Sequence, residues 1–329
     1  MYGIKKAFDW VEAFEKRGLS WTIPTWVPEG AVVLLAGAAG SGKSFLGLQA
    51  ALGLAGGGSA WGEKVEPKGK VLYLGADTNS HLFGQRLEML SRGLNAEQLA
   101  RVKENLYVNL DNSNLNVDKN FWMDIIDLKA RLIVVDCLVR YLRNNLDTDS
   151  GRISPVFTYF RAYAGKGSSV IVLHHFNKNT KAGADRQTLA RQIRGSSDLM
   201  ASVDLAYGLE ADGKVGLLRM VKNRVEQEKN LGLRFRFGEQ GLEAFEKVDL
   251  GLEAAALPER MVESLSVVLT EQAGLWMSRA ALCQALGQRE VLPGERTLDK
   301  AFASLGSLEG VQTQWGKRGE RLYRVGLKE

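Results

Sequence analysis

The sequence predicts an α/β protein in which a mostly parallel β-sheet with antiparallel edge strands is followed by a small C-terminal domain. Short apolar runs alternate with helical segments between residues 31 and 175. These runs lack polar alternation, as strands covered by helices on both faces require. After Asp204, apolar and polar residues alternate and glycine-containing turns separate the runs, which is typical of antiparallel hairpins. A Gly- and Ala-rich stretch then leads to further helical segments and a hairpin.

The composition is that of a soluble globular protein. Of the 329 residues, 45% are hydrophobic and 25% are charged. Because no segment approaches the roughly 18 apolar residues that a spanning helix needs, we expect no membrane association. The formal net charge of +5 favours a polyanionic partner, although a mildly basic soluble enzyme explains the charge equally well.

The cysteine content predicts neither a disulfide nor a zinc site. Cys137 and Cys283 are the only cysteines, and they lie far apart in the sequence without metal-ligand spacing. This usage fits a reducing compartment, so the cytoplasm is the expected location.

The elements of the predicted core follow one another from the N-terminus. Residues 1–29 form a lead-in segment, whose helical turns end at WTIPTWVPEG because its prolines and glycine break a helix. The core then spans residues 30–250. It begins with the strand AVVLLAG and the helix KSFLGLQAALGLAGG, and continues with VLYLGAD and HLFGQRLEMLSRGL. The runs LIVVD and SVIVLHH are two further buried strands.

Residues 256–329 are predicted to form a separate module. Helical segments are expected over 260–271, 278–286 and 295–305, followed by the hairpin VQTQWGKRGERLYRV with a basic glycine-containing tip. Three helices followed by such a hairpin indicate a winged helix, the helix-turn-helix variant with an appended β-ribbon.

A phosphate-binding loop follows the first core strand. The sequence fits the pattern G-x-x-x-x-G-K-[ST], in which backbone N–H groups point at phosphate oxygens. Lys43 is expected to reach the β- and γ-phosphates of a nucleotide, and the Ser44 hydroxyl to bind Mg²⁺. An apolar strand before the loop and an apolar helix after it distinguish this pattern from a chance glycine-rich turn. The predicted loop residues are Gly37, Ala38, Ala39, Gly40, Ser41, Gly42, Lys43 and Ser44.

Three further site residues end predicted strands. Asp136 closes LIVVD, where a carboxylate holds the magnesium shell through water or simply begins a turn. Asp77 ends VLYLGAD and is either the group that polarises the attacking water or a helix N-cap. His174 and His175 end SVIVLHH and point to opposite faces of the strand, so only one can face the nucleotide. We take His175 as the γ-phosphate sensor.

Together, WVPEGAVVLLAGAAGSGKS, VLYLGAD, LIVVD, VIVLHH and RGSSDLMASVD resemble the RepA-like branch of the RecA superfamily, whose namesake is a plasmid-encoded, ring-shaped hexameric replicative helicase. The resemblance covers roughly residues 20 to 225. It implies a RecA-like P-loop NTPase core that assembles as a homo-hexamer. It further implies ATP and Mg²⁺ at subunit interfaces and single-stranded DNA in the central channel.

The resemblance also implies roles for individual residues. Lys43 and Ser44 match the phosphate-loop residues and Asp136 the magnesium carboxylate, whereas the family usually has a glutamate at the position of Asp77. The Asp77 side chain is shorter than that of glutamate and would have to reach the attacking water differently.

The resemblance also suggests roles for four cationic side chains. Arg194 of RGSS matches an arginine that reaches into the neighbouring subunit's site, and Lys222 and Arg224 of VKNR lie where related rings supply cationic fingers. For each of these three, the alternative is a solvated surface cation. Arg86 is a candidate for contact with adenine.

Two regions are candidates for DNA binding. The loops YLRNNLDTDSGR and FNKNTKAGADRQTLARQIR would border the channel, and the second is long, basic and poor in apolar residues. Its cations are Lys178, Lys181, Arg186 and Arg191, and the alternative is a loop that contacts nothing. In the C-terminal module, the third helix and the wing carry Arg296, Lys300, Lys317 and Arg318. This module is nearly charge-balanced, so duplex DNA and a protein partner both remain open.

Three functions are compatible with the sequence. The first is a DNA-stimulated ATPase motor, a replicative helicase of a plasmid, phage or mobile element. The second is a RecA-like recombination or repair ATPase that coats strands without unwinding them. The third is a regulator in which ATP gates the winged helix.

Overall fold

The computed structural model describes residues 6–111, 119–141, 150–177, 186–193, 197–212, 215–224, 230–238, 241–248, 262, 264–287, 301–308, 310–316 and 320–325. The chain forms two compact units. Unit 1 comprises Met1–Ala211 and Gly216–Lys247, and unit 2 comprises Asp212–Val215 and Val248–Glu329. Unit 1 ends at Lys247, and the predicted core bounds of residues 30–250 stay a prediction.

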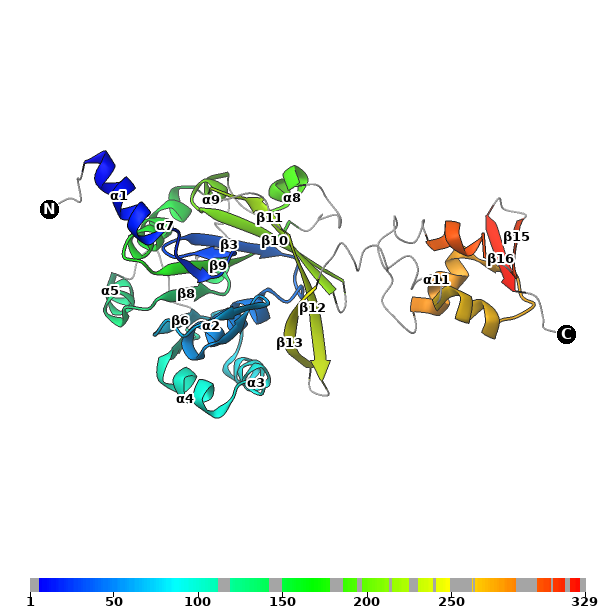
Figure 1. The fold of residues 1–329 in the computed structure, drawn as a ribbon, viewed down its shortest axis with the longest axis horizontal. Helices are drawn as coiled ribbons and strands as arrows, with labels where there is room; N and C mark the ends of the chain where they lie inside the picture. Colours follow the sequence, from blue (N-terminus) through cyan, green and yellow to red (C-terminus); the bar gives the residue numbers. More distant parts are fainter. Residues whose placement is uncertain are drawn as a thin grey trace. The chain divides into compact units, whose positions relative to one another are not determined.

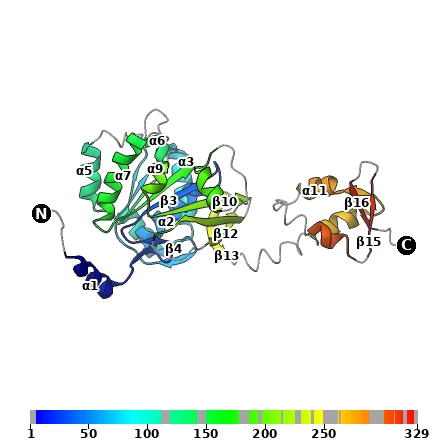
Figure 2. The ribbon, with the colours of Figure 1, turned by 90° about the horizontal axis from the view of Figure 1, so that it is seen from above.

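The first elements of unit 1 lie in the predicted lead-in segment. Helix α1 (Ala7–Arg17) lies at the periphery of the unit (Figure 2). The short strands β1 (Trp21–Ile23) and β2 (Val27–Pro28) then pair antiparallel. Ile23, Trp26 and Val27 are buried in the core, and the Tyr207 hydroxyl donates to the Trp26 carbonyl over 2.6 Å. This hairpin is therefore an integral part of unit 1.

A nine-stranded sheet forms the centre of unit 1, in the order β13-β12-β11-β10-β3-β9-β8-β6-β7 (Figure 1). The pairs from β10 to β7 are all parallel. The predicted mostly parallel sheet is therefore confirmed. The strands are β3 (Val32–Gly37), β6 (Val71–Leu74), β7 (Leu106–Asn109), β8 (Leu132–Val135), β9 (Ser169–His175), β10 (Leu205–Asp212), β11 (Val215–Lys222), β12 (Asn230–Gly238) and β13 (Gly241–Val248).

The last strands form the predicted antiparallel edge, with one correction. Strands β10 and β11 are joined by two residues, as are β12 and β13, and such short connections between neighbours allow only antiparallel pairing. Strand β10, which its alternating pattern assigned to this edge, instead pairs parallel with β3. The helices α8 (Arg186–Gln192) and α9 (Ser197–Ala201) lie between β9 and β10 in the sequence and provide the long crossover that a parallel strand needs.

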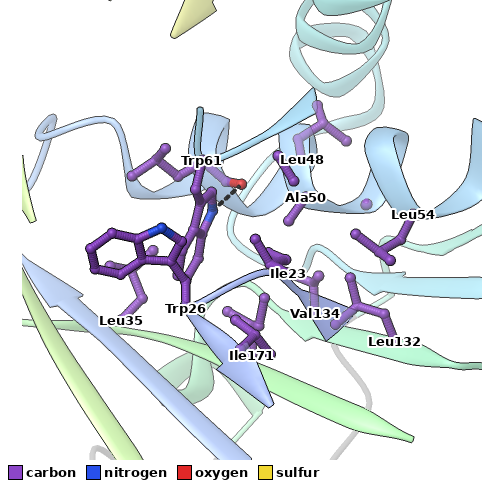
Figure 3. Packing of buried hydrophobic residues seen from close by; sticks show 14 of the residues in the cluster. Ile23, Trp26, Leu35, Leu48, Ala50, Leu54, Trp61, Leu132, Val134 and Ile171 are labelled. Carbon is purple, nitrogen blue, oxygen red and sulfur yellow. Dashed lines mark hydrogen bonds between the residues drawn. The ribbon is translucent and has the colours of Figure 1, made fainter. Parts of the chain in front are cut away.

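Helices cover both faces of the sheet because consecutive strand residues point to opposite sides. Val33 and Leu35 of β3 face the layer formed by α2 (Lys43–Gly56), α3 (Ser80–Ser91) and α4 (Ala96–Asn105). Figure 3 shows Leu35 and Ile171 in this layer, together with Trp61, whose indole N–H donates to the Leu46 carbonyl. Two short paired strands, β4 (Gly58–Ala60) and β5 (Glu63–Val65), close this side.

The opposite face carries a second hydrophobic layer. Val32 and Leu34 of β3 contribute to it, as do aromatic residues such as Trp122 and Phe160. Its helices are α5 (Lys119–Leu128), α6 (Leu138–Tyr141), α7 (Ser150–Ala164), α8 and α9. This three-layer arrangement explains why the buried strands carry apolar residues without polar alternation.

Unit 2 has its own small core. Leu265, Leu282, Phe302 and Tyr323 are buried in it. Its elements are helical residues 264–271, β14 (Met277–Ser278), α11 (Arg279–Gly287), helical residues 301–305, β15 (Val311–Trp315) and β16 (Arg321–Val325), with strand order β14-β16-β15. This order agrees with the expected helices and hairpin, and its assignment as a winged helix stays a prediction.

Within the described ranges, each helix is either too short or too polar to cross a membrane.

Candidate nucleotide-binding site

The predicted phosphate loop connects β3 to α2. Gly40 and Gly42 have φ angles of 77° and 91°, a left-handed conformation that glycine adopts without steric cost. Helix α2 begins at Lys43, directly after Gly42. Because Gly42 has no side chain to cap the helix, the first backbone N–H groups of α2 are suited to an anionic ligand.

Lys43 is folded into the loop. Its Nζ donates to the Gly37 carbonyl over 3.0 Å and to the Ala38 carbonyl over 2.6 Å. Burial lowers the pKa of Lys43, while the nearby Asp136 and, to a lesser extent, Asp77 raise it. The ammonium is therefore held by backbone carbonyls that a phosphate oxygen would have to replace.

Ser44 and Asp136 meet beside this lysine. The Tyr73 hydroxyl donates to Asp136 Oδ2 over 2.6 Å, and the Ser44 side chain lies near enough to this carboxylate to lower its pKa. Burial raises the pKa of Asp136, and the hydrogen bonds from Tyr73 and Ser44 lower it. A hydroxyl and a carboxylate in contact are the oxygen ligands that Mg²⁺ prefers, so these residues fit the expected ion.

Asp77 lies beyond the end of β6 and is held by a cation. Arg140 Nε donates to Asp77 Oδ1 over 2.5 Å. The N-cap of α3 is Asn79, whose side chain accepts from Leu82 N over 2.9 Å. The alternative role of Asp77 as a helix cap is therefore wrong, and its carboxylate is directed at Arg140.

The two histidines separate to opposite faces of β9, as the strand geometry predicts. His174 is fully buried with Val170 and Val172 on the face covered by α7. His175 lies on the α2 face, where its Nε2 is 3.3 Å from Cys137 Sγ. It is in register with Gly37, the first residue of the phosphate loop.

Four residues near the site escaped the sequence interpretation. Tyr73 binds Asp136, Arg140 holds Asp77, Cys137 contacts His175, and the Tyr141 hydroxyl accepts from Ala76 N over 3.0 Å. A partial signal existed, because Cys137 and Arg140 directly follow the strand LIVVD. Their partners lie on or just after other strands, so the local pattern could not identify the contacts.

Other predicted cations have defined positions. Arg86 donates to Thr78 Oγ1 over 3.1 Å, and its guanidinium lies 5.5 Å from the centre of the Phe45 ring. It also lowers the pKa of Asp136 electrostatically, so it lies on the magnesium side of the loop. Its contact with adenine stays a prediction.

Lys222 and Arg224 contact backbone carbonyls of their own chain. Lys222 Nζ donates to the Val203 carbonyl over 2.8 Å and also to that of Met200. Burial lowers the pKa of Lys222, as does the neighbouring Arg224. Arg224 donates to the Ala201 carbonyl over 3.2 Å. Their roles in a neighbouring subunit's site stay predictions.

The predicted basic loop after β9 is partly helical. Arg186 and Arg191 lie on α8, and Arg191 is exposed. Leu189 and Ile193 are buried in the core, so the expectation of little apolar packing was wrong at this end of the loop. Seven predicted cations lie outside the described residues: Lys178, Lys181, Arg194, Arg296, Lys300, Lys317 and Arg318.

The phosphate loop at the end of a parallel strand, with Ser44 and Asp136 beside Lys43, defines a P-loop ATPase. Residues 4–181, more than half of the chain, match a protein family described as an AAA domain. The chain belongs to this family.

Two solved structures resemble the chain. The ATPase domain of G40P is 13% identical, with a TM-score of 0.53, covering 75% of this chain and 100% of that one. A DnaB-like replicative helicase, studied with its interactions with primase, is 15% identical with a TM-score of 0.51. That match covers 65% of this chain and 57% of the helicase chain. At these identities the likeness confirms the predicted RecA-like fold.

Proposed function

We propose that this chain is a DNA-stimulated ATPase, a ring-forming replicative helicase of a plasmid, phage or mobile element that hydrolyses MgATP at subunit interfaces. The observation that supports it most is the contact of Ser44 with Asp136 beside Lys43. A triphosphate and its cation need these three groups together, and residues 92 positions apart (136 minus 44) supply them.

Each residue has a chemical role in this proposal. Lys43 exchanges its loop carbonyls for phosphate oxygens and offsets their charge. Ser44 and Asp136 would hold Mg²⁺, which neutralises charge on the β- and γ-phosphates when bound. Asp77 orients the attacking water, and Arg140 fixes the carboxylate that does so. Each contributes through position and charge, as phosphoryl transfer requires.

The backbone after β9 supports coupling between the nucleotide and DNA. Phe176 N donates to the Gly37 carbonyl over 3.1 Å, which ties the end of β9 to the phosphate loop. Phe176 also forms a β-bridge with Ile193, and Asn177 N donates to the Gln192 carbonyl over 2.7 Å. These two contacts close the base of the predicted DNA-binding segment at Phe176, the residue that directly follows His175. A shift of His175 on γ-phosphate loss would move that base.

Assembly into a ring remains part of the proposal. The two solved structures that resemble this chain are an ATPase domain and a DnaB-like replicative helicase, which favour a helicase over a filament-forming ATPase. In the ring, Arg194, Lys222 and Arg224 would steady charge at the neighbouring site. For Lys222 this requires exchanging its bonds to Met200 and Val203 for a phosphate.

The test is the ATPase rate of the wild type and Lys43→Ala with and without single-stranded DNA, together with native mass with and without ATP. We expect stimulation by DNA, a multimer in ATP, and a loss of about 10²–10³ in kcat for Lys43→Ala. Exposed Lys68 provides the matched control, because Lys68→Ala removes a lysine from the same unit and leaves the rate unchanged. A wild type that is monomeric in ATP and indifferent to DNA contradicts the proposal.

A forked-duplex assay separates the alternatives. ATP-dependent unwinding supports the helicase. Strand binding and stimulated hydrolysis without unwinding point to a recombination or repair ATPase. Slow hydrolysis independent of DNA points to an ATP-gated regulator.

A further inference from the structure

Three different metal-ligand side chains converge at one edge of the sheet. Leu74, Val135 and Val172 lie at the same level of the adjacent strands β6, β8 and β9. Counting onward, Asp77 lies three residues beyond the first, Cys137 two beyond the second, and His175 three beyond the third. Parallel strands end at the same edge, so the register itself brings a carboxylate, a thiol and an imidazole together.

The ligand atoms of this group lie at distances close to those of a tetrahedral metal centre. Cys137 Sγ is 3.3 Å from His175 Nε2 and 3.9 Å from Asp77 Oδ2. One ligand atom from each residue lies within 4.8 Å of the others. Zinc bonds of about 2.3 Å to sulfur and about 2.0–2.1 Å to nitrogen or oxygen separate tetrahedral ligands by about 3.3–3.6 Å. The Cys137–His175 separation falls in this range, and the Cys137–Asp77 separation of 3.9 Å is a few tenths of an ångström longer.

We propose that Asp77, Cys137 and His175 bind Zn²⁺, or a divalent cation of similar softness, and that occupancy of this site blocks ATP hydrolysis. The site differs in chemistry from the Ser44–Asp136 pair. A thiolate and an imidazole select Zn²⁺ over Mg²⁺, whereas a hydroxyl and a carboxylate suit Mg²⁺. Three protein ligands leave the fourth zinc position for water.

Two features of the site limit its affinity for the metal. Arg140 is paired with Asp77, and the metal must replace it. The Cys137 thiol is buried, and its proton leaves to solvent as the sulfur–metal bond forms. We therefore expect a reversible site that is weaker than a four-ligand structural zinc site, and one that a chelator empties.

Metal binding would inhibit ATP hydrolysis because two of the ligands have proposed roles in that reaction. Asp77 is the proposed water-orienting group and His175 the proposed γ-phosphate sensor. Coordination would fix both side chains on the ion, so neither could respond to nucleotide. This part of the inference rests on the proposed function, whereas metal binding itself does not.

The binding test uses the nucleotide-free full chain with a phosphine reductant. Co²⁺ replaces Zn²⁺ as a spectroscopic probe, because cobalt bound to a thiolate gives a charge-transfer absorption. We expect this absorption at one equivalent in the wild type and its reversal by added Zn²⁺. Cys283→Ser should retain the absorption, because Cys283 is not one of the three proposed ligands. Cys137→Ser should lose it.

The activity test titrates Zn²⁺ into the ATPase reaction at excess Mg²⁺. The rate of each variant with Zn²⁺ is divided by its own rate without Zn²⁺, so that any effect of Cys137→Ser on the basal rate cancels. The sensitivity of this variant to Zn²⁺ should fall about 10–100-fold, since losing a ligand costs at least as much as losing a residue that supports one. A chelator should restore the wild-type rate.

The outcomes are distinct. An absent cobalt–thiolate signal in the wild type, or a signal that persists in Cys137→Ser, overturns the site. If Cys137→Ser fails to fold, His175→Gln tests the same ligand set and should weaken binding by a similar factor. A clear cobalt–thiolate signal in a chain that never hydrolyses ATP supports the site and contradicts the proposed function instead.

Discussion

At the scale of single residues, the charge of Asp136 depends on two hydroxyl groups. Burial favours the neutral acid, and the hydrogen bonds from Tyr73 and Ser44 favour the carboxylate. A magnesium ligand has to be ionised. The neighbours of Asp136 therefore determine the pH at which the site becomes competent.

Tyr73→Phe should shift the acid side of the ATPase pH profile to higher pH. The substitution keeps the ring but removes the 2.6 Å hydrogen bond that stabilises the Asp136 carboxylate. Without that bond the pKa of Asp136 rises further, so a higher pH is needed to ionise it. The check is kcat/KM against pH at saturating Mg²⁺.

Tyr163→Phe is the matched control for this prediction. The Tyr163 hydroxyl donates to the Trp122 carbonyl over 3.0 Å within the hydrophobic layer on the opposite face of the sheet. Its loss should cost about 0.5–1.5 kcal/mol of stability and leave the pH profile in place. Equal profiles for Tyr73→Phe and the wild type would show that the Tyr73 bond does not govern Asp136.

The sequence predicts the candidate site residues that belong to a local pattern. Lys43 and Ser44 occupy fixed positions in one loop, and Asp136 ends a recognisable buried strand. Tyr73 and Arg140 could not be found in this way, because each bonds a partner 63 residues away. Such contacts depend on which strands are neighbours, and apolar periodicity does not encode that order.

At the scale of elements, helix α2 packs so closely on its surroundings that glycines are required on it. A Cβ added at Gly53 would lie 2.7 Å from the Ser59 carbonyl oxygen and 3.0 Å from Val65 Cγ2. Backbone atoms cannot move aside as a flexible side chain can. By contrast, a Cβ at Gly84 of α3 meets no described atom within 4 Å.

Gly53→Ala should therefore lower the free energy of unfolding, whereas Gly84→Ala should raise it. Overpacking of a close contact costs about 1–3 kcal/mol. Alanine in an open helical position gains about 0.5–1 kcal/mol through its higher helix propensity. Thermal and urea unfolding followed by circular dichroism compare the two variants. Stabilisation by both would mean that α2 can move away from Ser59.

Strands were predicted where their burial produces a clear pattern of apolar residues in the sequence. Strands β3, β8 and β9 are buried on both faces, so their apolar runs are unmistakable. Strand β10 carries alternation like that of an edge strand, yet it pairs with β3. Leu205, Ala206 and Tyr207 of β10 are all buried, so the alternation here reflects large and small side chains and encodes neither exposure nor the direction of the neighbouring strand.

At the scale of the whole molecule, each unit has a hydrophobic core of its own. The core of unit 1 lies on both faces of its sheet, and that of unit 2 is formed by residues such as Leu265 and Phe302. Nucleotide chemistry is confined to unit 1 in the proposed function. Unit 2 is thus available for a second ligand, and the predicted winged helix makes duplex DNA its proposed partner.

Removal of residues 251–329 should leave MgATP binding and cooperative unfolding intact while abolishing duplex binding. The nucleotide groups and their supporting core all lie before residue 249, whereas the predicted duplex contacts all lie after it. In the full chain, Lys317→Ala with Arg318→Ala should reduce the slope of log K against log salt by about 1.8, since each phosphate contact contributes about 0.9. Fluorescence anisotropy of a labelled duplex over a salt series measures both effects. Undiminished duplex affinity after the deletion would contradict duplex binding by unit 2, because the DNA contacts would then belong to unit 1.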